Sequence, residues 1–244
     1  MSSVDKNRLS VLIVDDESFQ RRILREVLRS LGFAKIKEAD SGQFAVVAMT
    51  EQNFDLVLSD VQMPGMNGLE LLRQIRTGHT QLARDSRFII LTSFSNTEVL
   101  GAAMALDVNG FLAKPIRIGV VMEKIDRAVQ ETFQLRAPGD YESVVTSLPS
   151  LEEARQQATG VRHSPAEKIA AGANEKAIPI MQLRVGMCVT KALVASDETL
   201  LIPAGTVLTQ LFINRLWDLS SVLTDELVHI TSTPRGESKA PQSA

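Results

Sequence analysis

Residues 56–68 read LVLSDVQMPGMNG, and this stretch decides how the first half of the chain is interpreted. Residues 56–59 form a short, largely aliphatic run, and Asp60 ends it. A short apolar run that ends at a polar residue predicts a buried strand. The Pro-Gly pair at 64–65 and the Asn-Gly pair at 67–68 predict a tight loop directly after it. The segment therefore predicts a carboxylate at the end of a central strand, with its side chain open at the rim of a sheet.

Runs of the same kind recur along the first half of the chain and alternate with segments of helical periodicity. We expect strands at 11–14, around Ile36, and at 56–59, 88–91 and 110–113, and helices at 19–31, 43–52, 69–76, 97–106 and 118–134. Strands that alternate with helices are typical of a parallel sheet covered on both faces. The predicted fold class is α/β, with a five-stranded, doubly wound parallel sheet in a domain of residues 1–136.

The first predicted helix carries a regular apolar row. Its members recur at every fourth position, namely Phe19, Ile23, Val27 and Leu31. We expect this row to face the sheet, and Gly32 to act as the C-cap.

The composition changes after residue 136. Residues 137–177 are rich in Pro, Gly, Ser, Ala, Glu and Gln and contain few apolar side chains. Such a segment cannot bury enough surface to offset chain entropy, so we predict a linker, with a short helix at 151–157 as an option. Residues 178–232 regain apolar runs and predict a small β-rich module with one helix at 209–219. Residues 233–244 predict a disordered polar tail.

The overall composition narrows the class of protein. The 244 residues are 44% hydrophobic and 23% charged, which is enough apolar material for two folded cores. The net charge of -3 offers no general attraction to nucleic acid or to an anionic membrane. Cys188 is the only cysteine, and the run at 12–14 is too short for a signal peptide or a membrane span. We therefore expect a cytoplasmic protein that binds neither nucleic acid nor membrane.

Polar residues follow several of the predicted strands: Asp15, Asp16, Asp60, Thr92 and Lys114. Ligands of such sheets bind outside the carboxyl ends of the strands, so these residues are expected to converge. Three carboxylates brought together need a cation, and Mg²⁺ suits an oxygen-rich site that also receives a phosphoryl oxygen. Asp60 is the candidate nucleophile toward phosphorus, with the Thr92 hydroxyl and the Lys114 ammonium facing the phosphoryl oxygens.

Four pieces of the chain resemble, in order, the response regulator receiver domain of two-component signalling: VDD at 14–16, SDVQMPGMNG at 59–68, LTS at 91–93 and FLAKP at 111–115. The resemblance implies a flavodoxin-like fold and phosphorylation of Asp60 by a histidine kinase or a phosphotransfer protein. It implies that Asp15 or Asp16 binds Mg²⁺ together with Asp60 and the backbone carbonyl of Gln62. It also implies a cis peptide bond before Pro115.

The same resemblance implies a conformational switch. Thr92 would move toward the phosphoryl group and Phe111 would rotate inward behind it, although Phe111 is equally compatible with a plain core position. Gln62 and Phe94 occupy positions that in this family influence the lifetime of the phosphoryl group. Because Phe94 cannot orient an attacking water, we expect a moderately persistent phosphoryl state.

The second half resembles the small module that precedes hydrolase domains of the HD-GYP class. The matching pieces are LRVGM at 183–187, LLIPAGTVLT at 200–209, Ile213 and Leu216. An HD-GYP hydrolase needs His-Asp pairs to hold metal, yet none of the three histidines is followed by Asp, and Gly-Tyr-Pro does not occur. We expect no enzyme beyond a chain that accepts, and slowly hydrolyses, its own phosphoryl group.

Two classes of output remain open. The C-terminal module can bind an unidentified output protein or pair two chains into a homodimer, and Trp217 is either part of its core or an anchor for such a partner. Alternatively, the chain is a regulatory subunit that controls a cyclic-dinucleotide enzyme. A DNA-binding output is less favoured, because residues 178–232 contain three basic side chains against five acidic ones.

Overall fold

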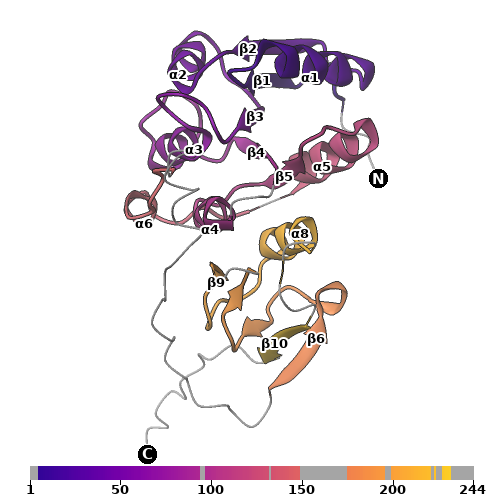
Figure 1. Ribbon diagram of the computed structural model, residues 1–244, viewed down its shortest axis with the longest axis vertical. Coiled ribbons are helices and arrows are strands. Elements are labelled where there is room, and N and C mark those ends of the chain that lie inside the picture. The colour runs from indigo at the N-terminus through magenta and orange to yellow at the C-terminus, as the bar shows by residue number, and fades with distance from the viewer. Residues whose placement is uncertain are drawn as a thin grey trace, which may run out of the picture. The chain divides into compact units, whose positions relative to one another are not determined.

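The computed structural model describes residues 5–93, 97–131, 133–148, 175–195, 199–220, 223 and 227–231 (Figure 1). The chain divides into two compact units, Met1–Lys168 and Ile169–Ala244. The expected helix at 151–157 and the tail at 233–244 lie outside the described residues.

A five-stranded parallel sheet forms the centre of the first unit. Its strands are β1 (Ser10–Val14), β2 (Lys35–Ala39), β3 (Leu56–Asp60), β4 (Arg87–Thr92) and β5 (Gly110–Ala113). The spatial order β2-β1-β3-β4-β5 is that of a flavodoxin-like sheet, which confirms the predicted fold class. The aliphatic residues of β1 and β3 are wholly buried, as expected for central strands with helices on both faces.

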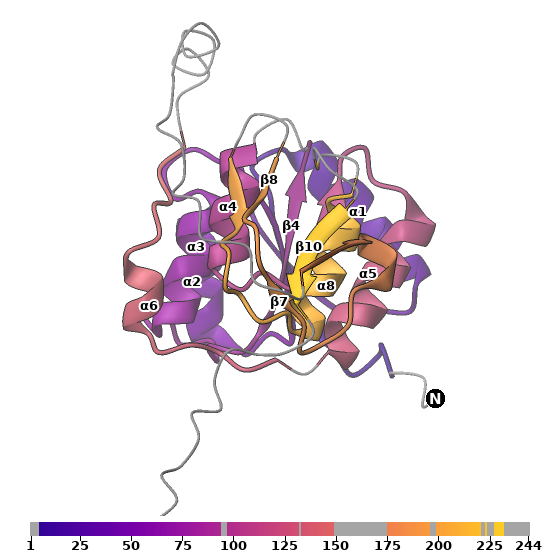
Figure 2. The same ribbon diagram turned by 90° about the horizontal axis from the view of Figure 1, so that it is seen from below.

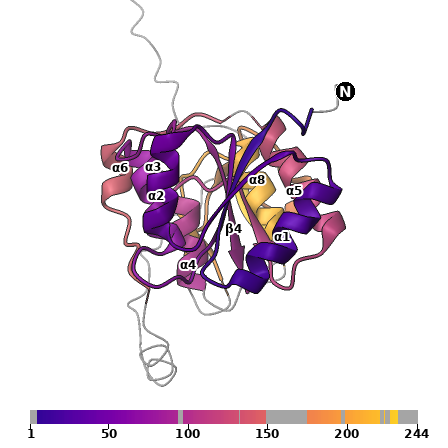
Figure 3. The ribbon, with the colours of Figure 1, turned by 90° about the horizontal axis from the view of Figure 1, so that it is seen from above.

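Five helices cover the two faces of this sheet. They are α1 (Ser18–Ser30), α2 (Gly42–Glu51), α3 (Gly68–Thr77), α4 (Thr97–Ala105) and α5 (Ile118–Gln130). Figure 3 shows α2, α3 and α4 on one face and α1 and α5 on the other. The strand-helix alternation read from the sequence is therefore confirmed.

The buried face of α1 differs from the predicted one. Leu24, Val27 and Leu28 are buried, whereas Phe19 is 71% exposed and Ile23 is 39% exposed. A row of every fourth residue drifts around the helix, because four residues turn it by about 400°. Only the later part of the predicted row therefore meets the sheet. The C-cap of α1 is Leu31 and not the predicted Gly32, which is the next residue and has a left-handed φ of 95°.

Helix α5 ends earlier than predicted, at Gln130 instead of residue 134. Glu131 has extended backbone angles, φ -72° and ψ 129°. The guanidinium of Arg87 explains the stop, because it donates to the carbonyl oxygens of Ala128 at 2.9 Å and Glu131 at 2.8 Å. These carbonyls belong to the end of the helix, where no intrahelical donor is available.

Residues 133–148 include the first part of the predicted linker at 137–177, and this part is packed on the first unit. They pack along the first unit, include the short helix α6 (Gly139–Glu142) and bury Tyr141 and Thr146. Helix α6 lies against α3 (Figures 1 and 3). We call residues 133–148 the strap. Its few apolar groups are enough to order the strap, because they pack against a domain that is already folded and need not form a separate core.

The second unit is small and mostly antiparallel (Figure 2). Its elements are β6 (Lys176–Pro179), the 3₁₀ turn η1 (Ile180–Gln182), β7 (Cys188–Val189), β8 (Leu193–Val194), β9 (Leu200–Ile202), α8 (Gln210–Asp218) and β10 (Leu227–Thr231). The sheets have the orders β6-β10-β7 and β8-β9. The predicted helix at 209–219 is confirmed as α8 with its two caps, Thr209 and Leu219.

Candidate functional site

The carboxyl edge of the five-stranded sheet gathers the polar residues singled out in the sequence. Asp15 and Asp16 follow β1, Asp60 and Thr92 end β3 and β4, and Lys114 follows β5. Neighbouring parallel strands in register end side by side, and Asp60 is paired with Leu91 while Thr92 is paired with Ala113.

Three carboxylates meet at this edge. One ligand oxygen from each of Asp15, Asp16 and Asp60 lies within 4.8 Å of the others. Asp15 and Asp60 are buried and Asp16 is exposed, so the group is open to solvent from one side. Hard oxygen donors at this spacing, with an open side, could hold a divalent cation that keeps some of its waters.

The ammonium of Lys114 binds two of these carboxylates. Its Nζ lies 3.0 Å from Asp60 Oδ1 and 3.1 Å from Asp15 Oδ2. Burial raises the pKa of Asp60, and Lys114 opposes that rise. Burial also lowers the pKa of Lys114, but attraction to Asp60 and Asp15 outweighs it, so its pKa is raised and the side chain stays charged. One ammonium against three carboxylates leaves the site net negative.

The loop after β3 fixes the position of Asp60. The Val61 amide donates to Asp60 Oδ1 at 2.8 Å, and the Gly68 amide closes the loop by donating to the Val61 carbonyl at 3.1 Å. A Cβ on Gly68 would overlap the Asp60 carbonyl oxygen, so this position requires glycine. Asn67 caps α3, since its Oδ1 accepts from the Glu70 amide at 2.9 Å.

The other predicted site residues have different placements. Thr92 is buried at the end of β4, and Phe111 is 1% exposed on β5, which is the core position that the sequence left open. Gln62 is exposed in the loop two residues after Asp60. The expected cis peptide bond between Lys114 and Pro115 is present. Phe94 lies outside the described residues.

The sequence reading missed a contact between the strap and this loop. Asn67 Nδ2 donates to the carbonyl oxygen of Thr146 at 2.8 Å, and both residues are buried. Tyr141, the only tyrosine of the chain, is fully buried in the same segment. Tyr141 is the only aromatic residue of the predicted linker at 137–177, and it was the available signal, because an unanchored linker has little use for one.

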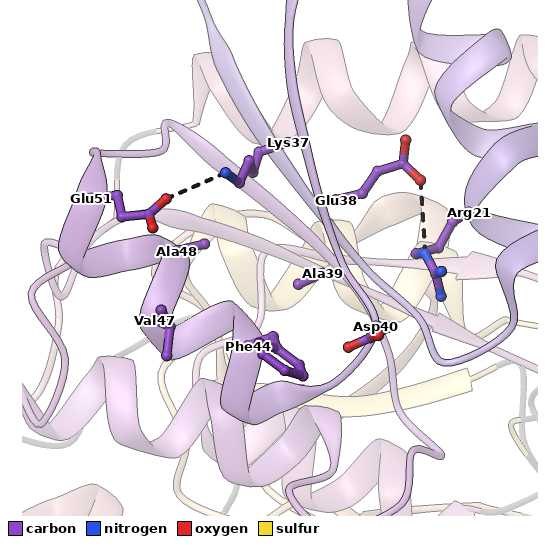
Figure 4. Close-up of a pocket in the computed structure, with 9 residues that line it drawn as sticks. All are labelled: Arg21, Lys37, Glu38, Ala39, Asp40, Phe44, Val47, Ala48 and Glu51. Carbon is purple, nitrogen blue, oxygen red and sulfur yellow. Dashed lines mark hydrogen bonds and ion pairs between the residues drawn. The ribbon is translucent and has the colours of Figure 1, made fainter.

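A separate surface pocket of about 360 Å³ lies between α1, β2 and α2 (Figure 4). Four of its five charged side chains are paired, Arg21 with Glu38 at 3.7 Å and Lys37 with Glu51 at 3.3 Å, and the fifth, Asp40, is exposed. None of the three clustered carboxylates lines it. The pocket therefore offers a ligand little unpaired charge, and the carboxyl edge remains the better candidate.

Comparison with known proteins supports this choice. The family model for the response regulator receiver domain matches residues 11–126. The chemotaxis protein CheY-3 of Vibrio cholerae is 36% identical over 127 residues, which are 52% of this chain and 96% of that protein. The chain belongs to the response regulator receiver domain family. Its first unit is the receiver unit, of the type found in two-component signalling.

Two further proteins are similar to the receiver unit. The chemotaxis protein CheY of Pseudomonas aeruginosa is 38% identical over 119 residues, 49% of this chain and 94% of that protein. The solved chemotaxis response regulator CheY4 of Vibrio cholerae shares 26% identity, covers 49% of this chain and 98% of that chain, and has a TM-score of 0.45. Within the described ranges, no helix of the chain combines the length and the apolar character needed to cross a membrane.

Proposed function

We propose that this chain is a response regulator whose Asp60 accepts a phosphoryl group from a histidine kinase or a phosphotransfer protein. The observation that carries the proposal is the contact of Lys114 Nζ with Asp60 Oδ1 at 3.0 Å, inside a cluster of three carboxylates. A carboxylate can act as the nucleophile toward phosphorus when cations balance the charge that builds on the phosphoryl oxygens.

The acidic cluster fits a magnesium ion. The donors are hard oxygens, two of the carboxylates are buried, and one ammonium does not neutralise three carboxylates. We assign Asp15, Asp16 and Asp60 as its side-chain ligands and the Gln62 carbonyl as a backbone ligand. When bound, Mg²⁺ supplies a Lewis acid that neutralises charge on the transferred phosphoryl oxygens.

The residues of the chain divide the remaining work. An oxygen of the Asp60 carboxylate forms the bond to phosphorus as the bond to the donor group breaks. Lys114 moves its ammonium from the free carboxylate to a phosphoryl oxygen, and the Thr92 hydroxyl donates to another. Thr92 and Phe111 then form the switch, while Gln62 and Phe94 set how long the phosphoryl group survives.

An apolar groove next to the carboxyl edge supports docking of the phosphoryl donor. Phe19 and Ile23 of α1 and Ile118 of α5 line a groove of about 600 Å³ that continues along α1 to Ser30, and these three side chains are at least 39% exposed. Both helices begin at the edge that holds Asp60. An apolar groove beside the nucleophile suits a protein donor, which must bind before it transfers.

For the output, we propose that the second unit signals without catalysis, by binding a partner protein or a second copy of the chain. Its exposed Met181, Val185 and Trp217 supply apolar contact area. The likeness to the segment before HD-GYP hydrolases gives the second candidate, control of a partner that turns over cyclic dinucleotides. Among the described residues, the acidic cluster of the receiver unit is the one group of three or more potential metal ligands.

The decisive experiment is phosphoryl incorporation from acetyl phosphate with Mg²⁺. The intact chain should acquire acid-labile phosphate, and Asp60→Asn should acquire none. Asp126→Asn, which changes a carboxylate on α5 that pairs with Lys6, is the matched control and should be labelled normally. Equal labelling of Asp60→Asn and the intact chain would refute the assignment. Light scattering on the labelled sample then tests homodimerisation.

A further inference from the structure

Two of the strap's contacts with the receiver unit involve buried side-chain hydrogen bonds at separate loops. One attachment lies at the turn between α4 and β5, and the other lies at the loop between β3 and α3, beside Asp60. The strap therefore connects the candidate phosphorylation site to the segment that leads toward the second unit. The surface along α3 is thus an interaction surface whose partner is the chain's own residues 133–148.

The first attachment is centred on Tyr141. Its hydroxyl donates to Asp107 Oδ2 at 2.7 Å and accepts from the Arg136 amide at 2.9 Å. The guanidinium of Arg136 lies 4.7 Å from the ring centroid, and its Nε is 3.3 Å from the same Asp107 oxygen. Burial of the ring, hydrogen bonds to its hydroxyl and the cation over its face together hold this part of the strap against the receiver unit.

The second attachment is centred on Asn67. This side chain faces two ways, since its Oδ1 caps α3 and its Nδ2 donates to the Thr146 carbonyl at 2.8 Å. Both partners are buried, so loss of the bond would leave polar groups unsatisfied. The orientation of the loop and the docking of the strap therefore depend on each other.

Hydrogen bonds link this second attachment to the Asp60 carboxylate. The Val61 amide donates to Asp60 Oδ1, and the Val61 carbonyl accepts from Gly68, the neighbour of Asn67. A cation or a phosphoryl group on Asp60 changes what its oxygens bind. Asn67 is joined to Asp60 through one short, closed loop, in which a Cβ on Gly68 would already collide with the Asp60 carbonyl oxygen.

We propose that the Asp60 pocket and the strap are coupled through Asn67. Mg²⁺ and a phosphoryl group immobilise the loop after β3, and the immobilised loop holds Thr146 and the strap more tightly. Coupling between two sites is reciprocal, so a docked strap also raises the affinity of the pocket for Mg²⁺. Asn67 is then a positioning residue of the site, and the phosphoryl part of this inference rests on the proposed function.

Hydrogen exchange of the intact chain tests the coupling. The amides of Tyr141 and Val144 are bonded within the strap, to the carbonyls of Pro138 and Tyr141. Mg²⁺ alone, and more strongly Mg²⁺ with acetyl phosphate, should slow exchange in the peptide covering 140–148 by about fivefold or more. Unchanged or faster exchange would overturn the proposal.

Two variants isolate the role of the amide. Asn67→Ser keeps a capping oxygen for α3 but loses the amide that reaches Thr146. In this variant, amide hydrogen exchange in the strap should be faster than in the wild type and should not change when Mg²⁺ is added. Its affinity for Mg²⁺, measured by calorimetry, should fall by about fivefold or more. Tyr141→Phe removes only the hydroxyl on Asp107 and should weaken Mg²⁺ binding in the same direction.

The coupling and the phosphoacceptor role of Asp60 are tested by separate readouts, so either can fail without the other. Phosphate labelling is measured on the same samples, so a chain that takes up no label refutes the phosphoacceptor role while the response to Mg²⁺ alone still decides the coupling. A wild-type affinity for Mg²⁺ in Asn67→Ser, with a normal far-ultraviolet spectrum, would overturn the coupling even if Asp60 is phosphorylated.

Discussion

The two units of the chain place their polar groups differently. In the receiver unit, parallel strands end together at one edge, and that edge gathers three carboxylates and Lys114. In the second unit, β6 and β7 run antiparallel to β10, so neighbouring strands end at opposite edges. Parallel order concentrates the polar residues that end strands, and antiparallel order disperses them. The comparison teaches that the topology of the first unit, more than its composition, creates the site.

Glycine replacements give the largest expected contrast between the units. Gly68→Ala should destabilise the receiver unit by about 3 kcal/mol, because the added Cβ would collide with the Asp60 carbonyl. Gly205→Ala should cost the second unit about 1 kcal/mol, because φ there is 86° but space is free. Thermal unfolding separates the effects, since Trp217 is the only tryptophan and reports on the second unit.

Gly119→Ala in α5 is the control for the first replacement. No atom lies within 4 Å of its added Cβ, so the change should stabilise the helix by about 1 kcal/mol. A Gly68→Ala chain as stable as the wild type would show that the loop adapts to the added Cβ. The close approach to Asp60 would then not require glycine at position 68.

One cation from each unit, the half-buried Lys114 and the buried Arg215, forms the next contrast. Lys114→Met removes the ammonium that faces Asp60 and should slow phosphoryl incorporation by about 100-fold, the usual cost of losing one charge-stabilising donor. Arg215→Met, in α8 of the second unit, should leave the labelling rate unchanged. A similar loss of rate in both variants would contradict the division of roles between the units.

Magnesium should stabilise only the receiver unit. At ten times its Kd, Mg²⁺ should add about 1.4 kcal/mol to the stability of that unit, and the Trp217 signal of the second unit should not move. Calorimetric unfolding with and without Mg²⁺ measures both. Asp60→Asn should lose most of the stabilisation, whereas a uniform shift of both transitions would point to a nonspecific salt effect.

The pH dependence of the magnesium-free chain sharpens the same test. Burial raises the pKa of Asp60 above its ordinary value of 3.8, so the ionised carboxylate opposes folding. That penalty is complete above the raised pKa and disappears as the pH falls toward 3.8. Asp60→Asn should therefore be more stable than the wild type at pH 7, and denaturant titrations should show the gap closing in acid.

The smallest contrast concerns helix caps. Ser41 accepts from the Phe44 amide at the start of α2, and Thr209 accepts from the Phe212 amide at the start of α8. Each Ala replacement should cost about 1 kcal/mol, and only in its own unit. A Thr209→Ala change that also lowers the receiver transition would show that the units unfold together.

The site was predictable because strand ends carry a strong local signal. Short aliphatic runs that stop at Asp15, Asp60 or Thr92 are visible without any structure, and parallel order brings them together. The strap was not predictable in this way. Tyr141 and Thr146 are buried by contacts with α3 and Asp107, which are distant in sequence. The local sequence pattern therefore gives no sign that these two residues are buried.

Other errors have the same origin. The sequence predicts a helix at 118–134, but α5 stops at Gln130 because Arg87, far away in sequence, binds its last carbonyls. Phe133 then lies under the guanidinium groups of Arg76 and Arg87. In the second unit, β7 and β8 have two residues each, too few to show a strand period.

The course of the strap also determines at which edge of the sheet the described part of the receiver unit ends. Helix α5 ends near Arg87, at the start of β4, but the strap carries the chain back to Asn67 at the carboxyl edge. The strap thus returns the chain from the start of β4 to the loop that follows Asp60, which is the loop that a cation or a phosphoryl group on Asp60 would affect first.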